Sequence, residues 1–134
     1  MSYKLGIAII YVHDIKKMTE FYTQVLGLAV VQEQTAQTFV TLATAGETWI
    51  ALADIAGPWV SRKLNLLATR HETTITPVSI ELSLEVEDVD ATWREWQAKG
   101  VPTLTAPQDF PFGRAFDAQD PEGHLLNIYK LRAR

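Results

Sequence analysis

Two stretches of the chain, about half its length apart, have the same pattern. Residues 7–14 (IAIIYVHD) and residues 81–88 (ELSLEVED) are apolar-rich strand patterns that end in Val-x-Asp and run directly into a helix pattern. An internal repeat of this kind indicates a fold built from two copies of one supersecondary unit. A duplicated sheet forms a cleft between its halves, so the residues that face the cleft decide the function.

The first copy continues with a helix and three further strands. A strand at residues 5–12 precedes a helix that Asp14 can cap at its start and Gly27 can end. Apolar side chains recur along this helix at three- and four-residue steps, as expected for one buried face. Strand patterns then follow at residues 28–34, 37–43 and 48–54, with a tight turn at residues 45–47.

The second copy repeats this order. A strand at residues 78–86 leads to a helix at residues 88–99 that Gly100 ends, and strands follow near residues 103–105, 113–118 and 125–131. The connection, residues 57–77, holds Gly57-Pro58 and Trp59 and predicts a short helical piece at residues 60–68. The alternative to a duplication is a chance likeness between two α+β segments. The helix caps and the glycines that end the helices recur in both halves, which favours duplication. The predicted fold class is α+β, with two βαβββ modules at residues 4–56 and 78–132 of one domain spanning residues 1–134.

Composition excludes several classes of protein. The formal charge of −4 and the lack of a Lys/Arg cluster argue against nucleic-acid binding. No apolar run approaches the roughly 20 residues that span a bilayer, and no signal peptide is readable. The chain has no cysteine, which excludes disulfides, thiolate catalysis and Cys-ligated zinc. We therefore predict a cytoplasmic protein without nucleic-acid or membrane partners.

The order of these motifs is similar to that of a known superfamily. The paired Val-x-Asp units, FY at residues 21–22, LGL at 26–28 and DPEGH at 120–124 resemble the vicinal-oxygen-chelate (VOC) superfamily of glyoxalase I, extradiol dioxygenases, fosfomycin-resistance enzymes and bleomycin-resistance proteins. The resemblance extends from about Leu5 to Leu131. It implies that the modules form a curved mixed sheet enclosing a cup, with the helices on the outer face, usually in a homodimer. It also implies that enzymatic members hold a divalent metal on the cup floor.

The metal positions implied by the resemblance lack most ligands. They fall at Ile7, Ala51, Glu81 and Asn127. Divalent metals in such sites are bound by imidazole or carboxylate donors, so a glutamate with a neutral amide is a poor ligand set. A solvated or locally bonded role is favoured for all three histidines, His13, His71 and His124. We therefore expect no cofactor and disfavour a divalent metal.

Alternation along the strands predicts which side chains face the cup. The candidate ligand-binding residues are Ile7, Ile9, Tyr11, Phe39, Trp49, Glu81, Ser83, Glu85, Phe112, Arg114, Asn127 and Tyr129. The aromatic residues could form flat walls or could be core residues, and the carboxylates could line an acidic ligand site or a merely hydrated face. Arg114 could bind an anionic group of a ligand or pair with Asp117 or Asp120.

Three functions remain open from the sequence. The first is a metal-independent small-molecule binder of the bleomycin-resistance type, with a cationic or aromatic ligand such as an antibiotic. The second is a glyoxalase-like lyase or an isomerase with a degenerate metal site, in which Glu81 is the general base or the remaining ligand. The third is a protein–protein module whose cup is only structural.

Overall fold

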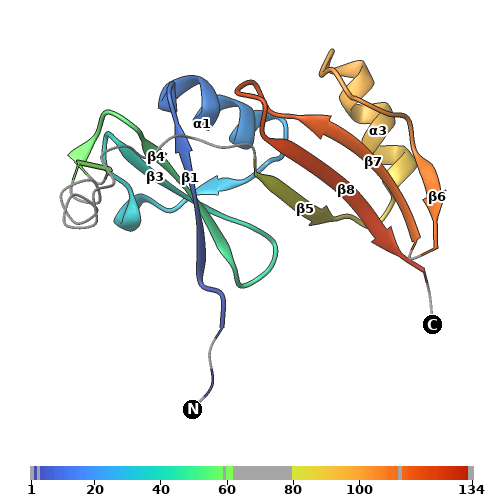
Figure 1. Cartoon of the computed structure of the whole chain (residues 1–134), viewed down its shortest axis with the longest axis horizontal. Coiled ribbons are helices and arrows are strands. Elements are labelled where there is room, and N and C mark those ends of the chain that lie inside the picture. Colours follow the sequence, from blue (N-terminus) through green and yellow to red (C-terminus); the bar gives the residue numbers. More distant parts are fainter. Residues whose placement is uncertain (1, 3, 59, 62–79, 112, 133–134) are drawn as a thin grey trace, which may run out of the picture. The chain divides into compact units, whose positions relative to one another are not determined.

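The computed structural model describes residues 2, 4–58, 60–61, 80–111 and 113–132. By its internal contacts the chain divides into two compact units, Met1–Pro77 and Val78–Arg134. Each unit contains one four-stranded sheet, and the two sheets have corresponding strand orders (Figure 1). None of the helices among the described residues is long and apolar enough to span a membrane.

The first unit, module 1, holds one helix against one face of its sheet. Its elements are β1 (Ile7–Val12), α1 (Ile15–Gln24), β2 (Ala29–Val30), the 3-10 helix η1 (Gln32–Gln34), β3 (Phe39–Ala43) and β4 (Trp49–Asp54). The strand order is β1-β4-β3-β2, with β1 parallel to β4 and the other pairs antiparallel. Met18 and Tyr22 of α1 are fully buried, as are Leu42 and Leu52 of the sheet. These apolar side chains form the core between α1 and the sheet.

The second unit, module 2, repeats this arrangement. Its elements are β5 (Glu81–Glu85), α3 (Val89–Ala98), β6 (Gln108–Phe110), β7 (Gly113–Gln119) and β8 (Leu125–Leu131). The strand order is β5-β8-β7-β6, with β5 parallel to β8 and the other pairs antiparallel. Trp96 of α3 packs edge-to-face on the buried Phe116 of β7, with ring centroids 5.4 Å apart. This contact fixes which face of the sheet lies under the helix.

Both helices begin and end as the sequence predicts. The Oδ1 atom of Asp14 accepts a hydrogen bond from the main-chain N–H of Lys17, and Asp88 does the same for Ala91, each at 3.0 Å. Gly27 and Gly100 follow the helices with φ of 70° and 71°, a conformation that glycine adopts without a steric penalty. The predicted α+β fold of two βαβββ modules is therefore confirmed. The cup that the resemblance implies stays a prediction.

Two predicted strands differ from the structure. Of residues 28–34, only β2 is a strand, because the hydroxyl of Thr35 donates to the carbonyl of Val31 and closes a turn over η1. Residues 103–105 form one isolated bridge, at Thr103, and the sequence did not predict β6. In the predicted helical piece, residues 60 and 61 are helical and the remainder lies outside the described residues. His71 also lies outside them.

Candidate functional site

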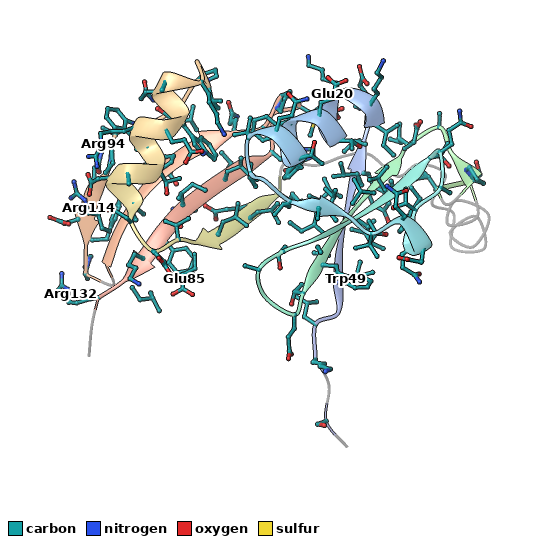
Figure 2. All side chains as sticks on the ribbon, turned by 180° about the vertical axis from the view of Figure 1, so that it is seen from behind. Glu20, Trp49, Glu85, Arg94, Arg114 and Arg132 are labelled. Atoms are coloured by element: carbon teal, nitrogen blue, oxygen red, sulfur yellow. The ribbon has the colours of Figure 1, made fainter. Side chains whose placement is uncertain are left out.

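In module 1, the sheet face opposite α1 gathers the predicted apolar and aromatic residues. The register pairs β1 with β4 and β4 with β3 so that Ile9, Ala51 and Thr41 form one row across the three strands. Side chains two positions away along each strand share this face; they are Ile7, Tyr11, Phe39, Trp49 and Ala53. Figure 2 labels Trp49 on this sheet. Most of this face is apolar, and its large side chains are partly exposed.

The centre of this face is closed by hydrogen bonds within the module. Thr41 is 0% exposed, and its hydroxyl donates to the carbonyl of Gln34 at 2.6 Å. The main-chain N–H of Thr41 donates to the hydroxyl of Thr35 at 3.1 Å. Ala51, beside Thr41 in the row, is also 0% exposed. The polar atoms of Thr41 are thus bonded to the segment around η1, and Ala51 offers no polar side-chain atom.

In module 2, the corresponding face is polar. Its central row across β5, β8 and β7 consists of Ser83, Asn127 and Asp117. The neighbouring rows are Glu81, Leu125 and Gln119 on one side, and Glu85, Tyr129 and Ala115 on the other. The three side chains of β5 on this face are exposed, whereas Asn127 and Tyr129 are half-buried. The structure therefore brings together Glu81, Ser83, Glu85, Asn127 and Tyr129, as the alternation predicts.

Asp117 also belongs to this face, although the sequence did not identify it as a site residue. The Asn127 Nδ2 atom donates a hydrogen bond to Asp117 Oδ1 at 2.9 Å. The main-chain N–H of Asp117 donates to the hydroxyl of Thr105 at 3.0 Å. Alternation along the predicted strand at residues 113–118 was the signal that could have identified Asp117. It was not sufficient, because the sequence does not give the register of β7 against β8, which places Asp117 beside Asn127.

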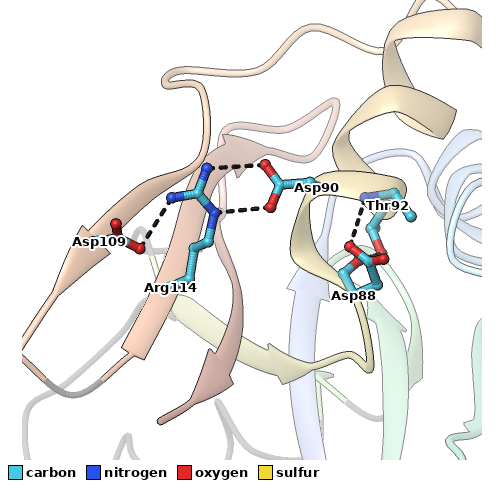
Figure 3. A network of polar contacts seen from close by, with 6 residues as sticks. Asp88, Asp90, Thr92, Asp109 and Arg114 are labelled. Atoms are coloured by element: carbon cyan, nitrogen blue, oxygen red, sulfur yellow. Dashed lines mark hydrogen bonds and ion pairs between the residues drawn. The ribbon is translucent and has the colours of Figure 1, made fainter.

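Arg114 lies on the other face of the module 2 sheet, on the side of α3. Its Nε and Nη2 atoms bind the carboxylate of Asp90 at 2.8 and 2.9 Å, and Nη1 binds Asp109 at 3.0 Å (Figure 3). The hydrogen bonds from Arg114 lower the pKa of Asp90, and those to Asp90 and Asp109 raise the pKa of Arg114. Arg114 thus pairs with Asp90 and Asp109, in place of the Asp117 and Asp120 considered from the sequence.

Two other predicted features have a clear outcome. His124 is 3% exposed and its Nδ1 atom lies 2.7 Å from Asp120 Oδ2, so His124 has the locally bonded role that was predicted. His13 is exposed at the end of β1. Phe112 lies outside the described residues, so its predicted contact with a ligand stays a prediction.

The residues at the family's metal positions do not fit a divalent metal. Ile7 and Ala51 carry no donor atom, and the amide nitrogen of Asn127 points to Asp117. Glu81 alone supplies a carboxylate. Among the residues that the structure describes, no group of three or more His, Asp or Glu side chains is placed to hold a metal ion. The two family positions in module 1 thus offer no ligand, whereas oxygen-ligated or nitrogen-ligated metals need several.

The two modules, each a mixed sheet with one helix on one face, define a class of α+β proteins with a duplicated βαβββ unit. The chain belongs to the Glyoxalase/Bleomycin resistance protein/Dioxygenase superfamily, whose family model matches residues 4–128. This match confirms the family to which the sequence motifs pointed.

Three relatives illustrate the range of this family. The uncharacterized protein YraH of Bacillus subtilis (strain 168) is 31% identical over 128 residues, which cover 90% of this chain and 92% of YraH. TnmS3, an antibiotic binding protein from Streptomyces sp. CB03234, is 22% identical with a TM-score of 0.74 and coverage of 98% of each chain. A lactoylglutathione lyase from Agrobacterium tumefaciens is 16% identical with a TM-score of 0.73, covering 96% of this chain and 94% of its own. The two solved structures share the fold with this chain, and at these identities they show the fold alone.

Proposed function

We propose that this chain is a metal-independent small-molecule-binding protein of the bleomycin-resistance type. The observation that carries the proposal is the composition of the four family metal positions, in which Ile7 and Ala51 have no donor, Asn127 has only a neutral amide oxygen, and Glu81 alone has a carboxylate. Members of the family bind small molecules either with or without a metal. A chain that has the family's sheets but lacks the metal ligands fits the metal-independent kind.

The candidate ligand surface of each module is the sheet face opposite its helix. On module 1 this surface presents Tyr11, Phe39 and Trp49, whose rings are suited to stacking on a flat ligand. On module 2 it presents the carboxylates of Glu81 and Glu85, which favour a cationic or hydrogen-bond-donating ligand. The description of TnmS3 as an antibiotic binding protein supports an antibiotic as the ligand. We also propose that the protein is a homodimer, as the family resemblance implies, and that it acts in the cytoplasm, as predicted from its sequence.

The proposal is tested by combining metal analysis with a binding screen. Protein purified without chelator is analysed for metal, then treated with chelator and screened by thermal shift against aromatic and basic antibiotics, with metal-free bleomycin as the first probe. A ligand that binds only the native state raises the unfolding temperature. We expect saturable stabilisation without metal. Stoichiometric bound metal, or binding that appears only after a divalent metal is added, contradicts the proposal.

The lyase or isomerase alternative predicts a different result. In that case Glu81 is a general base, and Glu81→Gln abolishes turnover while the fold persists. In the structure Glu81 is exposed on β5, an edge strand of its sheet, and within the part of the chain that the structure describes no contact favours a catalytic role for it. Turnover of a screened ligand that disappears in Glu81→Gln would replace the binding proposal with the enzymatic one.

A further inference from the structure

A row of three polar side chains crosses the face of module 2 opposite α3. Asp117 of β7 is directly opposite Asn127 of β8, and Asn127 is directly opposite Ser83 of β5. Residues next to one another along a strand face opposite sides of the sheet. Since Phe116 packs under Trp96 of α3, Asp117 and its row face away from that helix.

The orientation of the Asn127 amide is fixed by Asp117. A carboxylate accepts hydrogen bonds and does not donate them. The 2.9 Å contact is therefore donated by Asn127 Nδ2, which points toward β7. The amide oxygen and nitrogen leave the same carbon in different directions, so the Asn127 carbonyl oxygen points away from Asp117. Asn127 thus presents its carbonyl oxygen, an acceptor, to a ligand on this face, while one of its two N–H donors is bound to Asp117.

Asp117 is itself held in place through its main chain. Its N–H donates to the hydroxyl of Thr105 at 3.0 Å, and its carbonyl accepts from the N–H groups of Leu104 and Thr105 at 2.8 and 3.2 Å. It also forms part of the ladder between β7 and β8. Because the main chain of Asp117 is held in this way, its carboxylate can keep the neighbouring Asn127 amide in one orientation.

The charges around the row have one sign. Glu81 and Glu85 lie two positions from Ser83 on β5 and share its face. The cations of β7 and β8 are Arg114 and Lys130, which are paired in register and alternate to the other face. Among the described strand residues of module 2, the face opposite α3 therefore carries carboxylates and no cationic side chain, and its donors, such as the hydroxyls of Ser83 and Tyr129, are neutral.

We infer that Asp117 is a specificity-determining positioning residue, which holds Asn127 as a hydrogen-bond acceptor and thereby selects ligands that present N–H donors. The chemical class it favours is a planar cation with donors only, such as an amidinium or a guanidinium group. A ligand with acceptors only meets the Asn127 oxygen and the two glutamates, has only neutral donors such as the Ser83 hydroxyl to bind, and is disfavoured. This inference rests on the proposed binding function, because it assigns the selectivity of the same face.

Two planar probes of similar size test the selectivity directly. Benzamidine is a donor-only cation, and acetophenone is an acceptor-only neutral molecule. Each is titrated into ¹⁵N-labelled, chelator-treated protein, and dissociation constants are taken from the shifts of amide signals. Wild-type protein is expected to prefer benzamidine. In Asp117→Ala the Asn127 amide can rotate and donate, so the affinity ratio between the probes is expected to fall about tenfold.

Three further variants separate positioning from charge and from folding. Asp117→Asn retains an oxygen that can accept from Asn127 Nδ2, so it is expected to keep most of the wild-type ratio without the negative charge. Asp109→Ala removes a carboxylate from the α3 side and is the matched control with an unchanged ratio. Asn127→Ala assigns the Asn127 side-chain amide signal, because that signal is lost in the variant. That signal must shift in Asp117→Ala.

The outcomes distinguish this inference from the proposed function. A wild-type ratio in Asp117→Ala overturns the positioning role, and so does an equal loss in Asp117→Asn, which would make charge the cause. In both cases the wild-type protein still binds, so the proposed function stands. If the wild-type protein binds neither these probes nor any antibiotic of the screen, the proposed function fails and the inference fails with it.

Discussion

The two central rows of the modules occupy equivalent places and have different chemistry. In module 1 the third-strand residue is Thr41, and in module 2 it is Asp117; each donates its main-chain N–H to a threonine hydroxyl, at 3.1 and 3.0 Å. The side chain of Thr41 is buried and bonded to a main-chain carbonyl, whereas that of Asp117 is half-buried and binds Asn127. The repeated backbone arrangement therefore does not determine the function of either face. A few side chains at equivalent positions do.

Exchanging the two third-strand residues is the strongest way to break this comparison. Thr41→Asp places a carboxylate at a fully buried position beside the main-chain carbonyl of Gln34, which is an acceptor, so the free energy of unfolding is expected to fall by about 3–5 kcal/mol. Asp117→Thr changes a half-buried side chain and is expected to cost less than about 1 kcal/mol. Urea denaturation followed by tryptophan fluorescence measures both.

Thr41→Ser is the control for this exchange. It keeps the hydroxyl that donates to Gln34 and loses only a methyl group, so its cost is expected to be small beside that of the aspartate. Equal destabilisation by Thr41→Asp and Asp117→Thr would show that the two rows are equivalent in energy and would contradict the comparison.

The turns that precede the last strand of each module also differ in burial and in hydrogen bonding. Before β8, the buried Asp120 accepts hydrogen bonds from the N–H groups of Glu122 and His124 and lies 2.7 Å from the His124 ring. Before β4, Thr44 donates to Thr48 and accepts from Gly46. Asp120→Ala leaves buried donors without an acceptor and is expected to cost about 1–3 kcal/mol.

Thr44→Ala removes hydrogen bonds at a partly exposed turn and is expected to cost about 1 kcal/mol or less. Thermal unfolding of both variants checks the order. If Thr44→Ala lowers the free energy of unfolding more than Asp120→Ala does, burial of the turn before β8 does not make its hydrogen bonds the more stabilising ones.

The parts of the fold that follow from local chemistry were predictable from the sequence. The strand predicted at residues 125–131 coincides with β8, and both aspartate caps and both terminal glycines were identified. Each of these depends on residues near one another in the chain. β6 was missed because residues 108–110 acquire their strand conformation by pairing with β7, and the sequence contains no alternation strong enough to show it.

The site was predictable only in part, for a related reason. Alternation along one strand placed Glu81, Ser83 and Glu85 on one face without any knowledge of their neighbours. Asp117 needed the register between two strands, and Arg114 needed the position of α3, whose Asp90 lies 24 residues earlier in the chain. Both depend on tertiary contacts, which periodicity does not provide.

The helix caps test whether the modules are equivalent where their sequences agree. Asp14 and Asp88 both accept a hydrogen bond from the first turn of their helix at 3.0 Å. Asp14→Ala and Asp88→Ala are each expected to lower the free energy of unfolding by about 1 kcal/mol. Asparagine at either position should restore most of the loss, because its side-chain oxygen accepts the same bond. Unequal costs, measured by urea denaturation, would show that the repeat is not energetically symmetric at its helices.

The smallest effect is expected from the ion pair that joins α3 to β7 in module 2. Hydrogen bonds from Arg114 lower the pKa of Asp90 in the folded protein. Because the folded pKa is the lower one, the stabilisation is present above the unfolded pKa and is lost as the pH falls below about 4, through the folded value. The two side chains are 41% and 38% exposed, so solvent screening keeps the effect small. Asp90→Asn should therefore make the acid limb of a stability–pH profile, measured by urea denaturation between about pH 2 and pH 7, slightly less steep than in the wild type. Arg114→Gln should flatten the acid limb at least as much, because it removes the partner of Asp90 together with the contact to Asp109. A wild-type acid limb in both variants would show that the pair contributes nothing to stability.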